Sequence, residues 1–376
     1  MTESVKAAPA PAPQAPQAPE APEQEVVFEN GIDLARLHEM LQAARERRSG
    51  KDVDDRISTL NLVAMYFSAP GYEKARAALE VAGTVHPARL VALIAEPKSP
   101  GNNVRGQVSV LRSGGSVALE RIVLTATGAA VRHLQSAMLS LLVPELPVVF
   151  VWGGRPEGQL FEQALEKADR VIVDSGTRPL SAFLTLAHRI GYGAPVGDLA
   201  WARIFPWQSI AAEVLDQPNL REHRGRIQRA RIIAAGDPGA EAALLAGWFA
   251  SRVPRAKVEL LEGPEPSAEE AAPSVEPSSG ARNAVHAPPL APGQIAAFEF
   301  DAPPTVFRFR RERGILVGEV RGDDDGEVVH RVRLPAETPG RLIGLELGLL
   351  SGQDELYAAA VLAAARLLAE RRKENQ

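Results

Sequence analysis

Hydrophobic residues in the first half of the chain fall into short uninterrupted runs separated by stretches of helical spacing. Such runs are typical of strands that are buried on both faces of a parallel sheet. We expect strands of this kind, with a hairpin turn at Ser113-Gly114-Gly115, at residues 59–66, 89–95, 108–112, 116–124, 148–152 and 170–173. Between them, apolar side chains three and four positions apart predict helices at residues 72–83 and 129–142.

A different pattern, of short alternating strands, follows in the second half. An Asp-Asp-Asp-Gly stretch at 323–326 is typical of the turn between two antiparallel strands. We expect strands at residues 226–234, 257–261, 298–300, 306–310, 315–320 and 327–333. Helices are expected at 207–215, after Asp237-Pro238, near 340–350 and at 354–371.

The fold class that these patterns predict is α/β. Strand-helix-strand order in the first half favours parallel strands joined by crossovers, whereas the closely spaced later strands favour antiparallel pairing. We therefore expect an N-terminal mostly parallel α/β sandwich domain followed by an α+β domain with an antiparallel meander.

Composition changes along the chain predict where the domains begin and end. Residues 1–24 are mostly Ala, Pro, Gln and Glu and predict a disordered tail, because so few apolar side chains cannot offset the entropy of ordering. An N-terminal helix is expected within 25–56 and the α/β domain within 57–192. A Gly-Tyr-Gly-Ala-Pro-Val-Gly segment marks the boundary to the α+β domain at 193–376, in which a second low-complexity stretch predicts a disordered insert at 263–292.

The composition excludes several classes of function. The chain has 376 residues, 45% of them hydrophobic and 24% charged, so it can form two globular domains with their own cores. It contains no cysteine, which excludes disulfides, cysteine-ligated zinc and thiol nucleophiles. The formal net charge of −5 argues against nucleic acid as a partner. We expect neither a secretory leader nor a membrane span, and therefore a cytoplasmic protein with no membrane partner.

No residue pattern predicts a catalytic, cofactor or metal site. The seven histidines are scattered, and no two have the spacing with which one helix face holds a metal ion. The serines lack the turn motif of hydrolases, and the glycine-rich segments lack the spacing and the lysine of phosphate loops. Asp174-Ser175-Gly176 follows an expected strand, where open α/β sheets commonly bind ligands. We expect no catalytic residue, no cofactor and no metal, while this segment is either a structural cap or part of a ligand crevice.

Aromatic and arginine side chains gather in two stretches that follow the domain boundary. Tryptophan and arginine are favoured anchors of protein interfaces, because they combine a large area with directed hydrogen bonds. The aromatic string at 201–207 is equally suited to packing the seam between the two domains. The basic stretch at 221–231 is either a solvated loop that enters a strand, or a site for an acidic protein surface or a sugar phosphate. The sequence leaves these interpretations open. The candidate partner-binding residues are Trp201, Arg203, Phe205, Trp207, Arg224 and Arg226.

Four segments are distinctive as a set, although no single one would suffice to identify a family. They are LPVVFVW at 146–152, DRVIVDSG at 169–176, DLAWARIFPW at 198–207 and AALLAGWFASRV at 242–253. In this order and spacing they resemble the glucose-6-phosphate dehydrogenase assembly protein OpcA family. The resemblance covers roughly residues 60–371, outside the low-complexity insert.

The resemblance implies a protein that is not an enzyme. Members of the family bind glucose-6-phosphate dehydrogenase and promote its active oligomer, which feeds the oxidative pentose phosphate pathway and supplies NADPH. It therefore implies a non-enzymatic assembly factor and allosteric activator whose partner is this dehydrogenase. Cyanobacterial relatives are discussed as thiol-redox responsive, and a chain without cysteine cannot respond in that way. The alternative is an α/β protein or enzyme that binds a nucleotide or sugar phosphate at the strand ends near Trp152 and Asp174.

Overall fold

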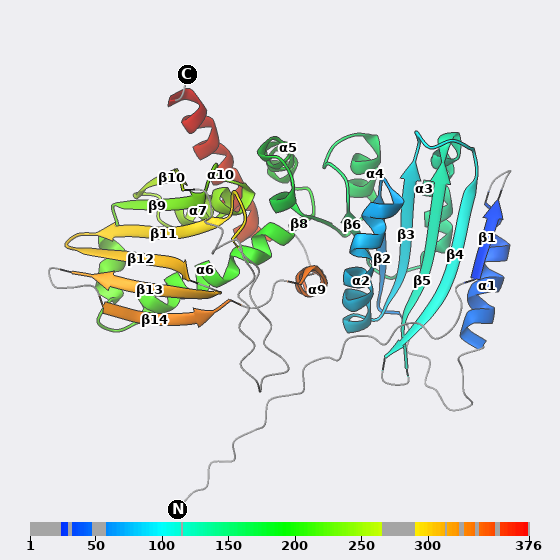
Figure 1. The fold of residues 1–376 in the computed structure, drawn as a ribbon, viewed down its shortest axis with the longest axis horizontal. Coiled ribbons are helices and arrows are strands. Elements are labelled where there is room, and N and C mark those ends of the chain that lie inside the picture. The colour runs from blue at the N-terminus through cyan, green and yellow to red at the C-terminus, as the bar shows by residue number, and fades with distance from the viewer. Residues whose placement is uncertain are drawn as a thin grey trace, which may run out of the picture.

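The chain forms two lobes that lie side by side, each built around one β-sheet (Figure 1). The expected tail up to residue 23, most of the expected insert (265–289) and the Asp-Asp-Asp-Gly turn lie outside the described residues. The computed structural model describes residues 24–28, 32–46, 58–113, 116–264, 290–312, 314–322, 327–334, 338–349 and 354–374.

The first sheet has eight strands in the order β1-β4-β5-β3-β2-β6-β7-β8. The β1–β4 and β4–β5 pairs are antiparallel, and all the other pairs in this sheet are parallel. The mostly parallel sheet expected for the first half of the chain is therefore confirmed. The strands are β1 (Gln24–Phe28), β2 (Leu60–Tyr66), β3 (Ala88–Glu96), β4 (Val104–Ser113), β5 (Ser116–Thr127), β6 (Val148–Trp152), β7 (Arg170–Val173) and β8 (Val196–Asp198).

Helices cover both faces of this sheet, as its continuous apolar strands require. In β2, Leu62 and Ala64 pack toward α2 and α9, whereas Val63 and Met65 pack toward the helices on the opposite face. One face is covered by α2 (Ala69–Val85) and α9 (Pro339–Leu347). The other face is covered by α1 (Leu34–Glu46), the 3-10 helix η1 (Gly128–His133) with α3 (Leu134–Leu141), α4 (Gln159–Lys167) and α5 (Leu180–Gly191).

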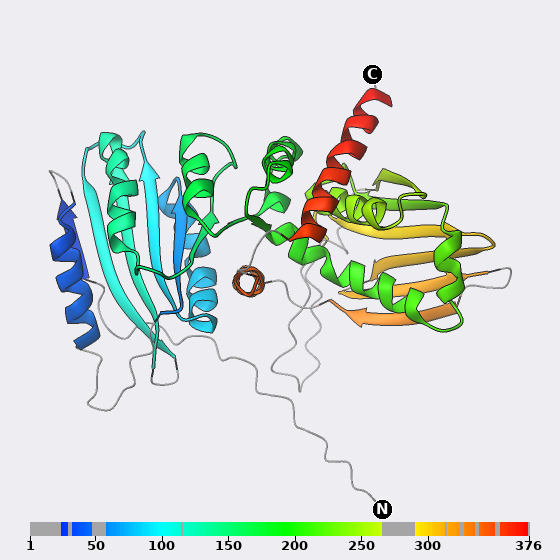
Figure 2. The ribbon, with the colours of Figure 1, turned by 180° about the vertical axis from the view of Figure 1, so that it is seen from behind.

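The second sheet has six strands in the order β10-β9-β11-β12-β13-β14, and all its pairs except β10–β9 are antiparallel. Its helices, α6 (Leu199–Asp216), α7 (Ala240–Arg252) and α10 (Glu355–Glu374), lie on one face only (Figure 2). Fully buried phenylalanines of β11 and β12 form the core between this face and the helices. The strands are β9 (Arg229–Ala235), β10 (Lys257–Gly263), β11 (Ile295–Ala302), β12 (Thr305–Glu312), β13 (Ile315–Arg321) and β14 (Glu327–Arg333), so the expected meander is confirmed.

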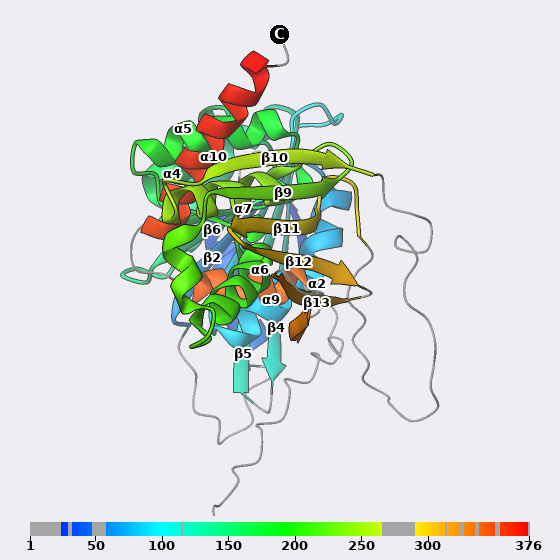
Figure 3. The ribbon, with the colours of Figure 1, turned by 90° about the vertical axis from the view of Figure 1, so that its left-hand side faces the viewer.

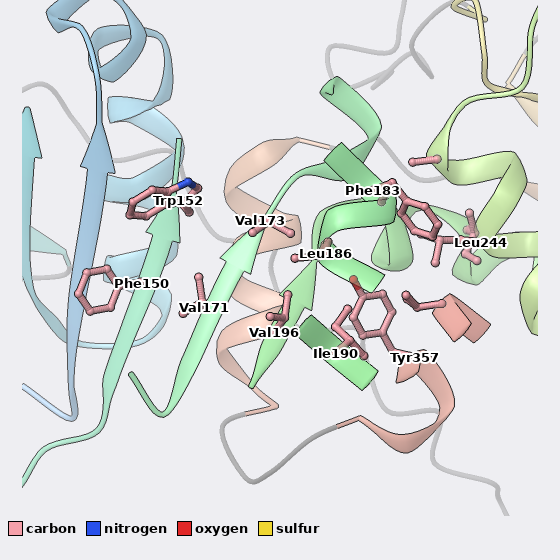
Figure 4. Close-up of a cluster of buried hydrophobic side chains, with 14 of the residues drawn as sticks. Phe150, Trp152, Val171, Val173, Phe183, Leu186, Ile190, Val196, Leu244 and Tyr357 are labelled. Carbon is pink, nitrogen blue, oxygen red and sulfur yellow. The ribbon is translucent and has the colours of Figure 1, made fainter. Parts of the chain in front are cut away.

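The end of the chain returns to the first lobe and joins the two cores. α9 packs against α2, and α10 packs against both α7 and α5. Figure 4 shows the result: Phe183, Leu186 and Ile190 of α5 lie between the strands of the first sheet and the side chains of Tyr357 and Leu244. The apolar core is therefore continuous from one sheet to the other.

Several elements differ from the sequence-based expectations near the boundary between the lobes. Strand β8 lies beyond the expected boundary at residue 193 and pairs with β7 in the first sheet. The helix expected at 207–215 begins at Leu199, because Asp198 caps it and Pro206 is accommodated inside it. The helix expected to open at Pro238 with Asp237 as its cap begins at Ala240 instead, and Gly239 stands at the cap position with its amide donated to Gly293 O at 3.0 Å.

Four strands and helices of the described residues were not predicted at all. They are β1, α4, α5 and β8, and each is short or lies beside a segment rich in Gly, Pro or charged residues. Over the part of the chain that the structure describes, none of the helices combines the length and apolar character that crossing a membrane requires.

Close packing of α7 on α10 depends on a glycine, which gives the first prediction. A side chain on Gly247 would meet the backbone of Ala360 and would lie 2.7 Å from the backbone nitrogen of Ala364. We expect Gly247→Ala to lower the free energy of unfolding by about 1–3 kcal/mol, because two helix backbones must separate. The control is Gly344→Ala in α9, where nothing lies within 4 Å, and we expect it to raise stability by roughly 0.5–1 kcal/mol. Urea unfolding of both variants measures this, and equal effects would contradict the packing described here.

Candidate functional site

The strand order of the first sheet reverses between β2 and β6, which places a potential ligand crevice at their carboxyl ends. Residues of the protein itself occupy this position. Gly153, directly after β6, donates its amide to Met65 O at 2.8 Å, and its lack of a side chain makes room for the Tyr66 ring. Arg178 donates to Gly153 O at 2.5 Å from the other side. The crevice is therefore lined by an aromatic ring and a guanidinium held on the backbone.

The first turn of α2 follows β2 directly and is the place where such folds hold a phosphate. Here the amide of Ala69 donates to the Glu96 carboxylate at 2.8 Å, and the amide of Gly71 donates to the Ser68 hydroxyl at 3.2 Å. Pro70 carries no amide hydrogen. The protein's own carboxylate thus takes the place of an external anion at this helix end.

The candidate segment Asp174-Ser175-Gly176 continues β7 and contacts the second lobe. The Asp174 carboxylate is paired with Arg203 of α6, which also donates from Nε to Glu241 of α7 at 2.6 Å. Gly176 leaves the space that these groups fill, since a side chain there would meet Arg203 and Glu241. This arrangement joins the end of β7 to a helix of the other lobe.

Arg203 is nearly buried, with 12% of its side chain exposed. Burial disfavours its charge, but the carboxylates of Asp174 and Glu241 outweigh this and raise the pKa of Arg203. Burial raises the pKa of Glu241, which Arg203 partly offsets. Because a buried charge is costly without a partner, this three-residue group, which we call the Arg203 clasp, fixes how the two lobes sit on each other.

A second buried group lies just behind it, beside β8. Arg170 of β7 and Glu346 of α9 are each 2% exposed and form an ion pair with a nitrogen–oxygen distance of 2.6 Å. The pair lies directly over Gly197, where any side chain would collide with both charged groups. Asp198 is fully buried and accepts from the amides of Ser175 and Ala200 at 3.0 and 2.9 Å, and from the Tyr357 hydroxyl at 3.2 Å.

The candidate residues in α6 are divided between the seam and the surface. The ring of Trp201 packs at a tilt against Tyr357, and its indole N–H donates to Asp354 at 3.1 Å. Trp207 is 5% exposed within the core. Arg203 belongs to the clasp. Phe205 is 65% exposed, which makes it the aromatic residue of this string that is open to a partner.

The other two candidates follow α6 in the 3-10 helix η3 (Arg221–Arg226). Arg224 donates to Leu215 O at 3.0 Å and is paired with Asp216, and about half of its side chain is exposed. The side chain of Arg226 is more exposed, and its guanidinium nitrogen lies 3.7 Å from a carboxylate oxygen of Glu222. Both are therefore surface charges that a partner could reach. The sequence could not separate the exposed from the buried members of this set, because spacing alone does not show which side of a helix is covered.

The buried residues Arg170, Glu346 and Tyr357 were missed by reasoning from the sequence. They come from β7, α9 and α10, and more than 150 positions separate Arg170 from Glu346 and Tyr357 from Asp198. The Asp198 position before an apolar helix was a readable signal for a helix cap. No group of three or more potential metal-binding side chains occurs among the described residues.

Two family models together match most of the chain, and they meet at the end of α5, just before β8. Residues 80–188 match the glucose-6-phosphate dehydrogenase subunit N-terminal domain, and residues 194–361 match the C-terminal domain of the same subunit. The fold and the site thus define a two-lobed α/β protein whose lobes are joined by buried ion pairs. The chain belongs to the OpcA family of glucose-6-phosphate dehydrogenase subunits, as its sequence motifs indicated.

Similar cyanobacterial proteins carry the provisional name OxPP cycle protein OpcA. The one from Synechocystis sp. is 33% identical over 36% of this chain and 30% of its own length. The one from Nostoc punctiforme is 32% identical over 45% of this chain and 38% of its own length. The chain spans less than half the length of the curated relatives it matches.

Solved structures with a related arrangement are more distant. The 3-ketoreductase KijD10 from Actinomadura kijaniata, in complex with NADP and TDP-benzene, is 11% identical with a TM-score of 0.45, over 83% of this chain and 97% of that chain. Biliverdin reductase from Synechocystis sp. is 9% identical with a TM-score of 0.42, over 83% of this chain and 98% of that chain. Likenesses this weak carry no information about activity.

The buried carboxyl of Asp198 gives the second prediction. Burial, opposed by amide hydrogen bonds, raises its pKa from 3.8 to about 6, so the folded state holds a proton that the unfolded state releases. This contribution to stability is full below about pH 4 and is lost as the pH rises through about 6. Asn at this position keeps the oxygen that accepts both amides and has no proton to lose. We expect the stability of Asp198→Asn relative to wild type to increase by about 3 kcal/mol between pH 4 and pH 7.

Urea unfolding of both proteins at the two pH values measures this difference. A difference that is the same at both pH values would contradict the raised pKa of Asp198. A second variant, Asp198→Ala, removes the helix cap as well and should be less stable than Asp198→Asn at either pH.

Proposed function

We propose that the protein is a non-enzymatic assembly factor and allosteric activator of glucose-6-phosphate dehydrogenase, working in the cytoplasm. The observation that carries this proposal is the match of both lobes to the two domains of one family of dehydrogenase subunits. The oxidative pentose phosphate cycle in the names of similar cyanobacterial proteins supports the same role. In this role the chain supports the active oligomer of the dehydrogenase and hence the supply of NADPH.

The geometry at the strand ends supports a role in recognition rather than in binding a nucleotide. A dinucleotide needs free amides at the first helix after the sheet and space beside the strand ends. In this protein Glu96 and Ser68 occupy the amides at the start of α2, and the ring of Tyr66 packs over Gly153. The residues best placed for chemistry are thus engaged with one another.

The surface that we assign to the dehydrogenase is formed by Phe205, Arg224 and Arg226. Phe205 combines a large apolar area with high exposure, and interface anchors are typically aromatic. The two arginines at η3 add charge at the end of the same helix. Trp201, Arg203 and Trp207 support this surface indirectly, because they hold α6 against Tyr357, Asp174 and Glu241.

Activation requires that the chain binds one state of the dehydrogenase more tightly than another. A coupling of about 1–3 kcal/mol changes the affinity for substrate roughly 5- to 150-fold. We therefore expect purified protein to lower the apparent KM of the dehydrogenase from the same organism for glucose 6-phosphate, and to increase the mass of the dehydrogenase complex. Steady-state kinetics and light scattering after chromatography measure the two effects.

Unchanged kinetics and unchanged oligomer size at saturating protein would reject the proposed function. A thermal shift of the isolated chain with nucleotides or sugar phosphates, in the absence of dehydrogenase binding, would favour the alternative of a small-molecule site near Trp152 and Asp174.

The role of Phe205 gives a further prediction. We expect Phe205→Ala to weaken binding to the dehydrogenase by about tenfold or more without changing thermal stability, because the side chain is exposed in the free protein. The matched control is Tyr192→Ala, which removes an 81% exposed aromatic ring from the end of α5 and should leave binding unchanged. Calorimetric titration of both variants decides this. Equal affinities of the two variants would remove Phe205 from the interface.

A further inference from the structure

The face of the second sheet that carries no helix bears rows of charged side chains in exact register. Glu259, Arg231, Glu299, Arg308 and Glu319 lie opposite one another across β10, β9, β11, β12 and β13. Charge alternates at every step along this row. The opposite face of the same strands is the phenylalanine core beneath α6 and α7 (Figures 1 and 3). The row therefore lies on the outward face of the lobe.

Two glutamates beneath this face each hold two arginines. Glu299 is paired with Arg308 and with Arg231. The nitrogen–oxygen distance between Arg231 and Glu299 is 3.4 Å. Its side chain is only 8% exposed, whereas those of Arg231 and Arg308 are 31% and 40% exposed. The carboxylate therefore lies close to the sheet, and the two guanidinium groups lie nearer to the solvent.

The same arrangement repeats two strands away. Glu319, 9% exposed, accepts from Arg310 at 2.6 Å and from Arg321 at 3.5 Å. Arg310 and Arg321 are 43% and 54% exposed. The two glutamates are separated by one intervening strand, which corresponds to about 10 Å. Each group also contains a second, more exposed carboxylate, because Arg231 is paired with Asp301 and Arg310 with Glu312, both at 2.9 Å.

Further charged residues lie at neighbouring positions, and among the described residues of the whole face eight cations stand against five anions. Their register places them on the same side of the strands as Glu299 and Glu319. The further cations are Arg229, Lys257, Arg331 and Arg333, and the further anions are Asp301 and Glu312. A chain with a net charge of −5 thus concentrates cations on one flat surface, which we call the arginine face.

We propose that the arginine face is a docking surface for an acidic protein surface, and that this surface belongs to the dehydrogenase named in the proposed function, on which the inference rests. Guanidinium groups bind carboxylates through paired N–H bonds and are enriched in protein interfaces. The buried glutamates hold these groups in place before binding, which lowers the entropy that docking costs. A second copy docked by the same face would bring like charges together, so charge complementarity favours an acidic partner.

The position of the arginine face is consistent with assembly. It lies on the side of the second sheet opposite to α6, which carries Phe205. The two surfaces therefore contact different regions of the dehydrogenase, or two of its subunits. A protein that binds on two sides can hold subunits together without adding a catalytic group.

The test is a double substitution, Arg308→Gln with Arg310→Gln. Glu299 keeps Arg231 and Glu319 keeps Arg321, so neither buried carboxylate loses all its partners. The matched control is Arg36→Gln with Arg105→Gln, which removes two exposed, ion-paired arginines from the first lobe and gives the same net charge. Thermal unfolding of each variant establishes that both are folded. Affinity for the purified dehydrogenase is then measured by calorimetry at low and at physiological ionic strength.

We expect the Arg308/Arg310 variant to bind about tenfold more weakly, with a smaller dependence on salt, and the Arg36/Arg105 control to bind like wild type. Equal affinity and equal salt dependence of the two variants would overturn the docking surface while leaving the proposed function intact. Failure of the wild-type chain to bind the dehydrogenase at all would overturn both. Binding of duplex DNA that is lost in the Arg308/Arg310 variant would assign the face to nucleic acid instead.

Discussion

The pairing of Arg203 with Asp174 and Glu241 is the interaction on which the arrangement of the molecule depends. Arg203 and Glu241 are largely buried and Asp174 is partly buried, so the guanidinium group needs its carboxylate partners in place. Asp174 belongs to the end of β7, Arg203 to α6 and Glu241 to α7, so the clasp can form only when the lobes sit in one orientation. The hydrophobic effect is non-directional, whereas the hydrogen bond from Arg203 to Glu241 at 2.6 Å requires one relative orientation of its groups.

This constraint shows how α6 contributes to the arrangement of the lobes. Its inward residues hold the lobes together, whereas Phe205 is exposed on its outer side and belongs to the surface that we propose for partner binding. The strand ends, which in many α/β proteins bind cofactors, are engaged with the protein's own side chains. The second sheet adds an ordered array of arginines. A protein with these features is organised to present fixed surfaces, in agreement with the family to which it belongs.

The sequence predicted the fold better than the site. Buried strands such as β6 and β7 could be predicted directly, because strands covered on both faces consist of uninterrupted apolar residues. β6 is apolar throughout, and in β7 three apolar residues follow Arg170. The meander could be read from its alternating pattern and turns. The start of α6 was missed, because Pro206 is unfavourable inside a helix and favoured a start after it, although Asp198 before the apolar run was a readable cap. For Trp201 and Trp207, burial depends on α10 and on the second sheet, and no local pattern carries that information.

The late return of the chain to its first lobe also bears on how the protein is made. Arg170 belongs to the first sheet and is synthesised early, but its partner Glu346 lies 176 positions further along the chain. Until α9 has left the ribosome, the first lobe has a cation in its interior without its carboxylate, and α2 has an uncovered apolar side. Complete folding of the first lobe thus requires nearly the whole chain. A chain that ends before α9 lacks a helix that covers its first sheet.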